Sequence, residues 1–186
     1  MKRLSLVLCS ALFALTVHAQ DVKFSAPDAS PADIVYYPLN AAKVKAGDNS
    51  TPVIKVVYSR PAKKGREIFG ALEPFGKVYR LGANESTEIR FFKPVVIGKK
   101  EIKAGAYSLF AIPNKDNWTI ILNKQTDRWG AYTYDASKDE VRVDVPVKPL
   151  ENVVENFSIT FVPLEDGANL VIGWDKTSVL LPIQFK

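Results

Sequence analysis

Three arginines, Arg60, Arg66 and Arg80, lie in one stretch of the chain that is rich in glycine and proline. A planar guanidinium group can hold a carboxylate or a phosphate through two parallel hydrogen bonds. Stretches of this composition form loops, and loops on a rigid scaffold often carry binding groups. The same arginines could instead pair with nearby carboxylates and brace the loop, in which case they would bind nothing.

Further polar and aromatic residues could complete a binding site around these arginines. Two polar residues follow them closely, and two aromatic rings occur later in the chain. Amphipathic rings offer a stacking face for a sugar or another flat ligand, although rings of this kind also cap cores beneath loops. The predicted binding residues are Arg60, Arg66, Arg80, Asn84, Glu85, Trp129 and Tyr132.

Two finer expectations concern how this site is built. Arg60 and Arg80 should reach the same pocket as Trp129, which would place an anion grip beside a stacking face. Asn84 should brace the irregular loop, because asparagine suits turns and an irregular backbone needs hydrogen-bond partners.

Pairs of carboxylates offer a second kind of chemistry. Glu85 and Glu88, or one of them with Glu73 or Asp127, could act as acid and base on a glycosidic bond. That reaction needs two carboxyl groups about 5 to 10 Å apart and no histidine. The chain has 20 acidic residues, so accidental pairs are common, and Glu85 and Glu88 are weak catalytic candidates.

The composition excludes several kinds of site. The chain has one Cys, one His and one Met, all within its first 19 residues. Without them the remaining domain lacks a Ser-His-Asp triad, a thiolate nucleophile and the usual zinc ligands. Asp135, Asp139 and Glu140 could bind Ca²⁺ through oxygen atoms, but their spacing is typical of a surface turn. We therefore expect no metal and no cofactor.

The first 19 residues have the three parts of a secretory signal peptide. Lys2 and Arg3 form a positive region, residues 4–17 are apolar and uncharged, and Ala19 is the small residue before the cleavage point. The apolar stretch is shorter than the roughly 20 residues that a membrane span needs. Cleavage before Gln20 would lower the net charge from +5 to +3. We expect a periplasmic or secreted protein with no membrane span in its mature form and no nucleic-acid partner.

The chain divides into three regions. Residues 1–19 are the predicted signal peptide, 20–52 a lead-in segment that could hold an edge strand, and 53–186 one β domain. From residue 53 onward apolar residues recur mostly at every second position, which is typical of strands that bury one face. Eight to ten short strands separated by regular turns indicate an all-β, sandwich-like domain.

Turn residues predict how some of the strands connect. Gly98-Lys99 should close one hairpin, and Asp175-Lys176 should close the last one. Pro182 should lie at an edge of the sheet because proline has no N–H to donate. A short helix could form around residues 135–139.

The alternating pattern also predicts which residues form the core. Runs at residues 141–145 and 157–161 are expected to be two separate short strands, and residues two apart in a strand share a face. The predicted core residues are Ile89, Phe91, Tyr107, Leu109, Trp118, Ile120, Val143, Phe157, Ile159, Ile172, Trp174 and Leu181.

Several motifs are similar to those of a known family. Among them are Tyr58-Ser59-Arg60-Pro61, Pro74-Phe75-Gly76-Lys77-Val78-Tyr79-Arg80, Ala104-Gly105-Ala106-Tyr107-Ser108-Leu109-Phe110 and Trp129-Gly130-Ala131-Tyr132. Over residues 53–183 the chain resembles the exported-protein family called domain of unknown function 2911, with Tyr79 where that pattern would have tryptophan. The resemblance implies export and an all-β domain, and it implies no activity.

The residues predict non-catalytic binding of a small polar or anionic ligand, for example a glycan or a molecule derived from the cell envelope. A carboxylate-based hydrolase acting on glycans is the first alternative. The second is a structural envelope protein whose polar motifs only brace its loops. The geometry of the motif side chains should distinguish these three functions.

We expect the exported protein to be cleaved between Ala19 and Gln20, because the N-terminus carries all three parts of a signal peptide. Intact mass and N-terminal sequencing of the secreted or periplasmic fraction measure this directly. A mature mass that still includes residues 4–17 would contradict the prediction.

Overall fold

The computed structural model describes residues 21–41 and 51–186. The predicted signal peptide with its cleavage site, and part of the predicted lead-in segment, lie outside these residues. The described chain is all β, as predicted, with a short 3₁₀ turn, η2 (Ala136–Lys138), where a short helix was expected. Within the described residues no helix is long and apolar enough to cross a membrane.

Nine antiparallel strands form one open sheet in the order β1-β2-β3-β6-β7-β8-β9-β4-β5. The edge strand expected in the lead-in segment is present as β1. The two separate sheets of the predicted sandwich are not observed among the described strands. The strands are β1 (Ala32–Tyr37), β2 (Ile54–Ser59), β3 (Thr87–Phe91), β4 (Val95–Ile97), β5 (Lys100–Ile102), β6 (Gly105–Pro113), β7 (Asn117–Asn123), β8 (Asp139–Leu164) and β9 (Gly167–Phe185).

The predicted division of the C-terminal part into short strands is wrong. Residues 141–145 and 157–161 belong to the same 26-residue strand, β8, and β9 is one strand of 19 residues. Asp175-Lys176 does not close a hairpin, because β9 pairs with β8 on both sides of it. Asp175 has a φ of 54°, and the ladder shifts its register beside it. The residue types that adopt a positive φ in turns also do so at bends within a strand. The sequence pattern therefore did not distinguish a bend at Asp175 from a hairpin turn.

The expected turn at Gly98-Lys99 is confirmed, whereas the expectation that Pro182 lies at an edge is wrong, because β9 has β8 and β4 as neighbours. Gly98 and Lys99 have φ values of 56° and 70° and close the β4–β5 hairpin, as a two-residue turn requires. Pro182 falls between two ladders, because the pairing of β9 with β8 ends at Val179 and its pairing with β4 begins at Gln184. The missing N–H of Pro182 therefore interrupts neither ladder.

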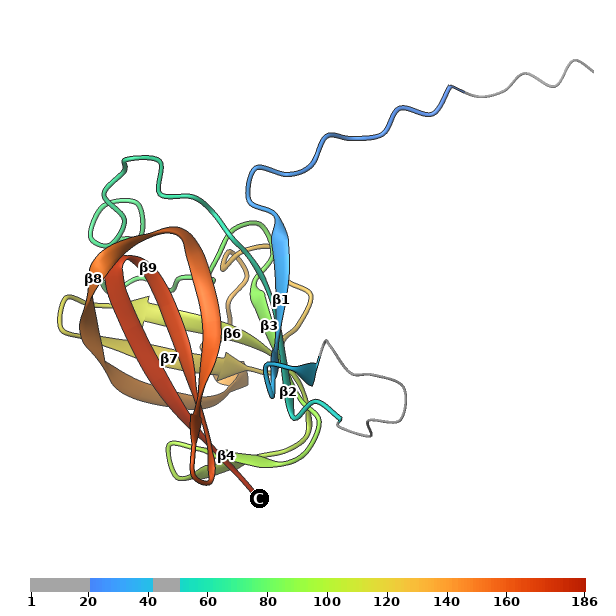
Figure 1. Cartoon of the computed structure of the whole chain (residues 1–186), viewed down its shortest axis with the longest axis vertical. Coiled ribbons are helices and arrows are strands. Elements are labelled where there is room, and N and C mark those ends of the chain that lie inside the picture. The colour runs from blue at the N-terminus through green and yellow to red at the C-terminus, as the bar shows by residue number, and fades with distance from the viewer. Residues whose placement is uncertain (1–20, 42–50) are drawn as a thin grey trace, which may run out of the picture.

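The β8–β9 hairpin closes the fold by crossing the C-terminal end of its own second strand. The Phe185 N–H donates to the Asp166 carbonyl oxygen at 2.8 Å, and the Tyr37 hydroxyl donates to the Gly167 carbonyl oxygen at 3.3 Å. Figure 1 shows both long strands curving, with the tip of the hairpin near β4 and the C-terminus. A Cβ atom at Gly167 would lie 2.0 Å from the Ile183 carbonyl oxygen, so this crossing requires glycine.

The core includes the predicted positions, but a larger number of buried residues were not predicted, among them those of β2 and β4. All of the predicted core residues are buried except Val143, which is partly buried and packs against the others. The pattern missed a smaller apolar contact on the opposite face of β6. There, buried Phe110 meets Tyr134 edge-on, with ring centroids 5.2 Å apart. Both faces of β6 are therefore covered, and the loop that carries Tyr134 is held against the sheet.

We expect Gly167→Ala to lower the free energy of unfolding by more than about 2 kcal/mol, because the new methyl group would overlap backbone that cannot move without opening the crossing. Urea denaturation followed by tryptophan fluorescence measures this. Gly173→Ala, in the same strand, is the control: its Cβ would have no heavy atom nearer than 3.7 Å. The control should change stability by less than about 1 kcal/mol. Equal losses in the two variants would show that the crossing is not special.

Candidate functional site

Arg60 joins the edge strand β1 to β8 through all three of its guanidinium nitrogens. Its Nη1 donates to Asp33 Oδ2 at 2.9 Å, its Nη2 to Ser158 Oγ at 2.9 Å, and its Nε to the Phe157 carbonyl oxygen at 3.2 Å. Asp33 belongs to β1 and the other two partners to β8. The fork of Arg60 is therefore used in bracing, and its contacts lie with β1 and β8 rather than with the segment that contains Trp129.

Arg66 also braces the chain. Its Nε donates to the Lys63 carbonyl oxygen at 2.9 Å and its Nη2 to the Ala62 carbonyl oxygen at 2.6 Å, so the guanidinium closes a tight turn. With Lys64 and Ser30 it lines an open surface hollow of about 280 Å³. The hollow is basic but shallow, and the guanidinium of Arg66 already donates to two backbone carbonyl oxygens.

Arg80 differs from the other two arginines. Among the described residues its side chain forms no hydrogen bond or ion pair, and its Nε is buried without a partner. A Cβ atom placed on Gly130 would lie 3.7 Å from Arg80 Cδ and 3.1 Å from the ring of Tyr132. The absence of a side chain at Gly130 therefore lets the arginine stem and the tyrosine ring lie close together.

Backbone pairing holds the segment of Arg80 against the segment of Trp129. The Gly130 N–H donates to the Asn84 carbonyl oxygen at 2.9 Å, and Glu85 forms an isolated β-bridge with Trp129. Asn84 has a φ of 60°, and its Nδ2 donates to Asp28 Oδ1 at 3.1 Å. Asn84 thus braces the loop, as its residue type suggested.

The two aromatic rings of the predicted site are open to solvent. Trp129 is 62% exposed and Tyr132 is 83% exposed, whereas most other large rings of the protein are buried. Neither ring caps the core. Exposed rings beside an unengaged guanidinium are a suitable surface for a flat, negatively charged molecule.

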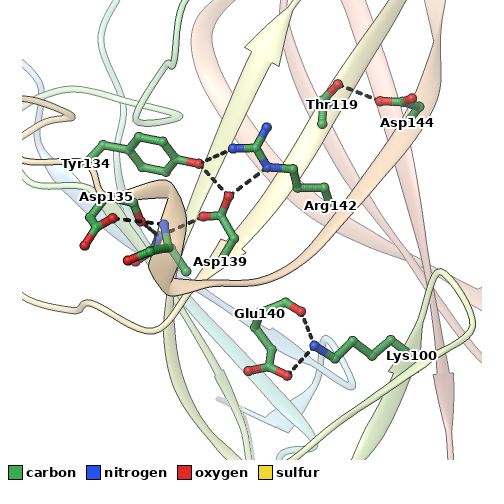
Figure 2. A network of polar contacts seen from close by, with 10 residues as sticks. Lys100, Thr119, Tyr134, Asp135, Asp139, Glu140, Arg142 and Asp144 are labelled. Carbon is green, nitrogen blue, oxygen red and sulfur yellow. Dashed lines mark hydrogen bonds and ion pairs between the residues drawn. The ribbon is translucent and has the colours of Figure 1, made fainter.

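A polar network fixes the base of the loop that carries these rings, and Figure 2 shows its members. The Tyr134 hydroxyl donates to Asp139 Oδ2 at 2.7 Å, and Arg142 donates to that same carboxyl oxygen at 2.7 Å and to the Tyr134 hydroxyl at 2.8 Å. Asn123, at the end of β7, donates to Asp139 Oδ1 at 2.8 Å. Burial, assisted by the Asp139 carboxylate, raises the pKa of Tyr134 to about 12, so its hydroxyl remains a donor.

Sequence reasoning missed this positioning network, although one signal was present. Arg142 and Asp144 alternate with valines in β8, which places both on the outer face of the sheet next to the loop. Arg142 then meets Tyr134 and Asp139, and the Asp144 carboxylate accepts from Thr119.

The carboxylates considered for calcium are taken up by other partners. Asp139 binds Arg142, and Glu140 pairs with Lys100 at 2.8 Å (Figure 2). Glu140 also pairs with Lys124 at 2.5 Å. Hydrogen bonds from these two lysines lower the pKa of Glu140. Asp135 accepts from the Ser137 N–H and caps η2. Within the part of the chain that the structure describes, no group of three potential ligands is placed to hold a metal ion.

A separate cavity is acidic. It has a volume of about 310 Å³, is open to solvent, and is lined by Glu85, Glu88, Asp127 and two serines, Ser59 and Ser86. It lies on the outer face of the sheet, where Glu88 of β3 is paired with Val57 of β2. Three of the four carboxylates considered for acid–base chemistry are therefore brought together. The fourth, Glu73, does not line this cavity.

Glu73 lies instead at the base of a compact turn near Arg80. Its N–H donates to the Ile68 carbonyl oxygen at 2.8 Å, and its own carbonyl accepts from the Gly70 N–H at 2.9 Å. Burial raises the pKa of its carboxyl to about 7, which the nearby charges of Arg80 and Arg66 only partly oppose. The charge next to Arg80 thus changes near neutral pH.

Comparison with known proteins gives a family and no closer relative. A family model described as a protein of unknown function, DUF2911, matches residues 39–183. No curated protein and no solved structure matches the chain.

The free energy of unfolding should fall as pH rises from about 4.5 to about 7 and then level off, as far as Glu73 contributes. Its carboxyl titrates at about 7 in the folded protein against 4.5 normally, so ionisation opposes folding. Partial exposure reduces the effect to roughly 1 to 2 kcal/mol.

Urea denaturation at about pH 5 and pH 8 tests this dependence. Glu73→Gln should remove this part of the fall and be more stable than the wild type at the higher pH, because it has no charge to desolvate. Glu67→Gln, at an exposed position of the same loop, is the matched control and should keep the wild-type profile. An unchanged profile in Glu73→Gln would contradict the assignment.

Proposed function

We propose a binding function for this chain, which belongs to the DUF2911 family of proteins of unknown function. The proposed ligand is a small anionic molecule with a flat portion, held without catalysis by Arg80, Trp129 and Tyr132. The observation that carries the proposal is the unengaged guanidinium of Arg80, whose buried Nε has no partner among the described residues. A carboxylate or phosphate offers acceptors in the geometry that this planar fork requires.

The different roles of the three arginines support this choice. Arg60 and Arg66 donate to five acceptors between them, all from the protein itself. The loop is thus braced without Arg80, so a bracing role does not explain why Arg80 is there. A buried donor with no partner is unfavourable, and a ligand that engages the guanidinium would offset that penalty.

The surroundings of Arg80 suit a ligand that also has a flat face. Gly130 lets the Tyr132 ring and the Arg80 stem approach each other. The β-bridge between Glu85 and Trp129 keeps the Trp129 backbone beside the segment that carries Arg80. The network of Tyr134, Asp139 and Arg142 holds the base of the same loop. A loop backbone fixed in this way loses little conformational entropy when a ligand binds to the side chains that it carries.

Export and a sandwich-like packing of the sheet complete the proposal. The N-terminal pattern of charge, apolar residues and Ala19 supports a periplasmic or secreted location. Tyr58 of β2 meets Phe157 of β8 with ring centroids 5.9 Å apart, which supports a sheet that folds over on itself around a shared core.

The acidic cavity favours a second candidate function, the hydrolysis of glycans. Glu85, Glu88 and Asp127 line one open cavity, and a glycosidase needs a facing pair of carboxyl groups in such a place. Release of reducing ends from glycans by the mature protein, abolished in Glu85→Gln or Glu88→Gln, would favour the hydrolase over the binding protein.

We expect Arg80→Ala to weaken the best ligand by at least about tenfold, because it removes a charge-assisted pair of hydrogen bonds. The ligand is found by a thermal-shift screen of the mature protein against organic acids, nucleotides, sugar phosphates, sugars and peptidoglycan fragments. Calorimetric titration then compares the variants. Arg80→Lys keeps the charge without the fork and should restore only part of the affinity.

Two controls make this test decisive. Arg90→Ala removes an exposed arginine of β3 and should leave the affinity unchanged. The melting temperature of Arg80→Ala should stay within about 2 °C of the wild type, since the side chain braces nothing. If no compound in the screen binds, or if Arg80→Ala binds as tightly as the wild type, the structural envelope protein is the better description.

A further inference from the structure

The ring of Phe69 packs against a group of buried aromatic side chains. Its centroid lies 4.6 Å from that of Trp118, 6.5 Å from that of Tyr79 and 6.3 Å from that of Trp174. Phe157 joins the same wall, 6.0 Å from Tyr79 and 5.9 Å from Trp174. We call these four surrounding residues the aromatic cage. Its members are buried, whereas Phe69 is only partly buried and is the ring nearest to solvent.

The cage contains polar atoms that its present occupant cannot satisfy. The Tyr79 hydroxyl and Trp118 Nε1 are both buried, and neither donates to an acceptor among the described residues. The Gly82 N–H faces the Tyr79 oxygen closely enough to lower the pKa slightly, but it leaves the hydroxyl proton without an acceptor. By contrast, Trp174 Nε1 donates to the Glu155 carbonyl oxygen at 3.1 Å. Burial raises the pKa of Tyr79 well above its usual value, so its hydroxyl stays protonated and able to donate. The hydrocarbon ring of Phe69 offers no acceptor, and buried donors normally have one.

The chain around Phe69 can release the ring without disturbing the sheet. The backbone hydrogen bonds of residues 67–75 stay within residues 67–77 and reach no strand of the sheet. The turn is tied to the sheet at its two ends, through Lys63 and Gly76, and by the buried side chain of Ile68. Gly70 follows Phe69 directly and has a φ of 95°. Because glycine adopts many backbone conformations at little cost, the chain can change direction at this position. Withdrawal of the Phe69 ring therefore breaks no ladder.

We propose that the aromatic cage is a binding site for a neutral flat ring that bears a hydrogen-bond acceptor, and that Phe69 occupies the cage when this ligand is absent. The ligand ring replaces the Phe69 ring, and its acceptor takes a hydrogen bond from Tyr79 or Trp118. The proposal does not rest on the Arg80 site. That site combines a partly buried arginine with two exposed rings and selects for negative charge, whereas the cage is buried and selects for a neutral ring.

Two probes of nearly the same size test the chemistry, since acetophenone has a carbonyl acceptor where ethylbenzene has a methylene group. Both are titrated into ¹⁵N-labelled mature protein that carries Trp129→Phe, so that the remaining indole N–H signals come from Trp118 and Trp174. Acetophenone should move the Trp118 signal the most, because Trp174 already donates to a protein carbonyl. Ethylbenzene should bind several-fold more weakly.

Substitution of the occupant tests whether Phe69 competes with the ligand. Phe69→Leu should raise the affinity for acetophenone about tenfold. In the wild type only those molecules in which Phe69 has left the cage can bind, and this lowers the apparent affinity. Phe92→Leu, at a phenylalanine that is 48% exposed, is the matched control and should leave the affinity unchanged. Tyr79→Phe should reduce the preference for acetophenone over ethylbenzene.

Two outcomes overturn the proposal. If neither probe moves the Trp118 signal in the wild-type cage, Phe69 is a permanent part of the core. If Phe69→Leu binds both probes equally well, the substitution has only opened an apolar cavity. If Phe69→Leu does not fold, the comparison of the two probes in the Trp129→Phe protein still decides whether the cage selects an acceptor.

Discussion

The close approach of Gly167 to the carbonyl oxygen of Ile183 is the constraint on which the rest of this fold depends. At that point the β8–β9 hairpin crosses the end of its own second strand, and the two backbones leave no room for a side chain. Strands as long as these can return to the start of the sheet only by bending. The bend carries Phe157 to Tyr58 and lets Asn156 pair with Ala62, so the middle of β8 meets the segment that follows β2. Closure of the hairpin thus pins the irregular segment from which both proposed sites are built.

When that segment is held in place, the neighbours of each polar side chain determine its role. Some side chains find hydrogen-bond partners within the protein, and others remain available to a ligand. Arg60 lies between β1 and β8 and spends its fork on Asp33, Ser158 and a backbone carbonyl. Arg80 lies beside Gly130, where the described residues offer its guanidinium no acceptor. The carboxylates of Asp139 and Glu140 are likewise held by cations and a tyrosine, which leaves them unsuited to a metal. Two arginines of the same segment therefore differ in role: Arg60 braces the fold, whereas Arg80 is left for the proposed ligand.

In the described part of the chain, three buried side-chain atoms lack a hydrogen-bond partner. They are the Tyr79 hydroxyl, Arg80 Nε and Trp118 Nε1, and the first two belong to consecutive residues. Glu73, whose carboxyl is partly desolvated, is close enough to Arg80 for its pKa to be affected. Native proteins satisfy nearly all buried donors, so the unsatisfied ones are a departure from consistency that commonly accompanies a functional site. The proposed anionic site and the proposed role of the aromatic cage both start from these unsatisfied donors.

The sequence by itself determined the all-β class, part of the core and the tight hairpin at Gly98-Lys99, and it carried the motifs of the family. These features depend on local periodicity, since a side chain in a strand faces the core or the solvent according to its parity, and on the backbone freedom of single residues. Tertiary structure alone decided that Asp175 bends one long strand instead of closing a hairpin, that Arg60 is engaged while Arg80 is not, and that Phe69 sits among three buried rings. Each of these outcomes depends on partners far away in the chain, such as Asp33 and Ser158 for Arg60, or Trp118 and Trp174 for Phe69. A pattern of residue types carries no information about such distant partners, because the distances between them are set only when the long strands bend and cross.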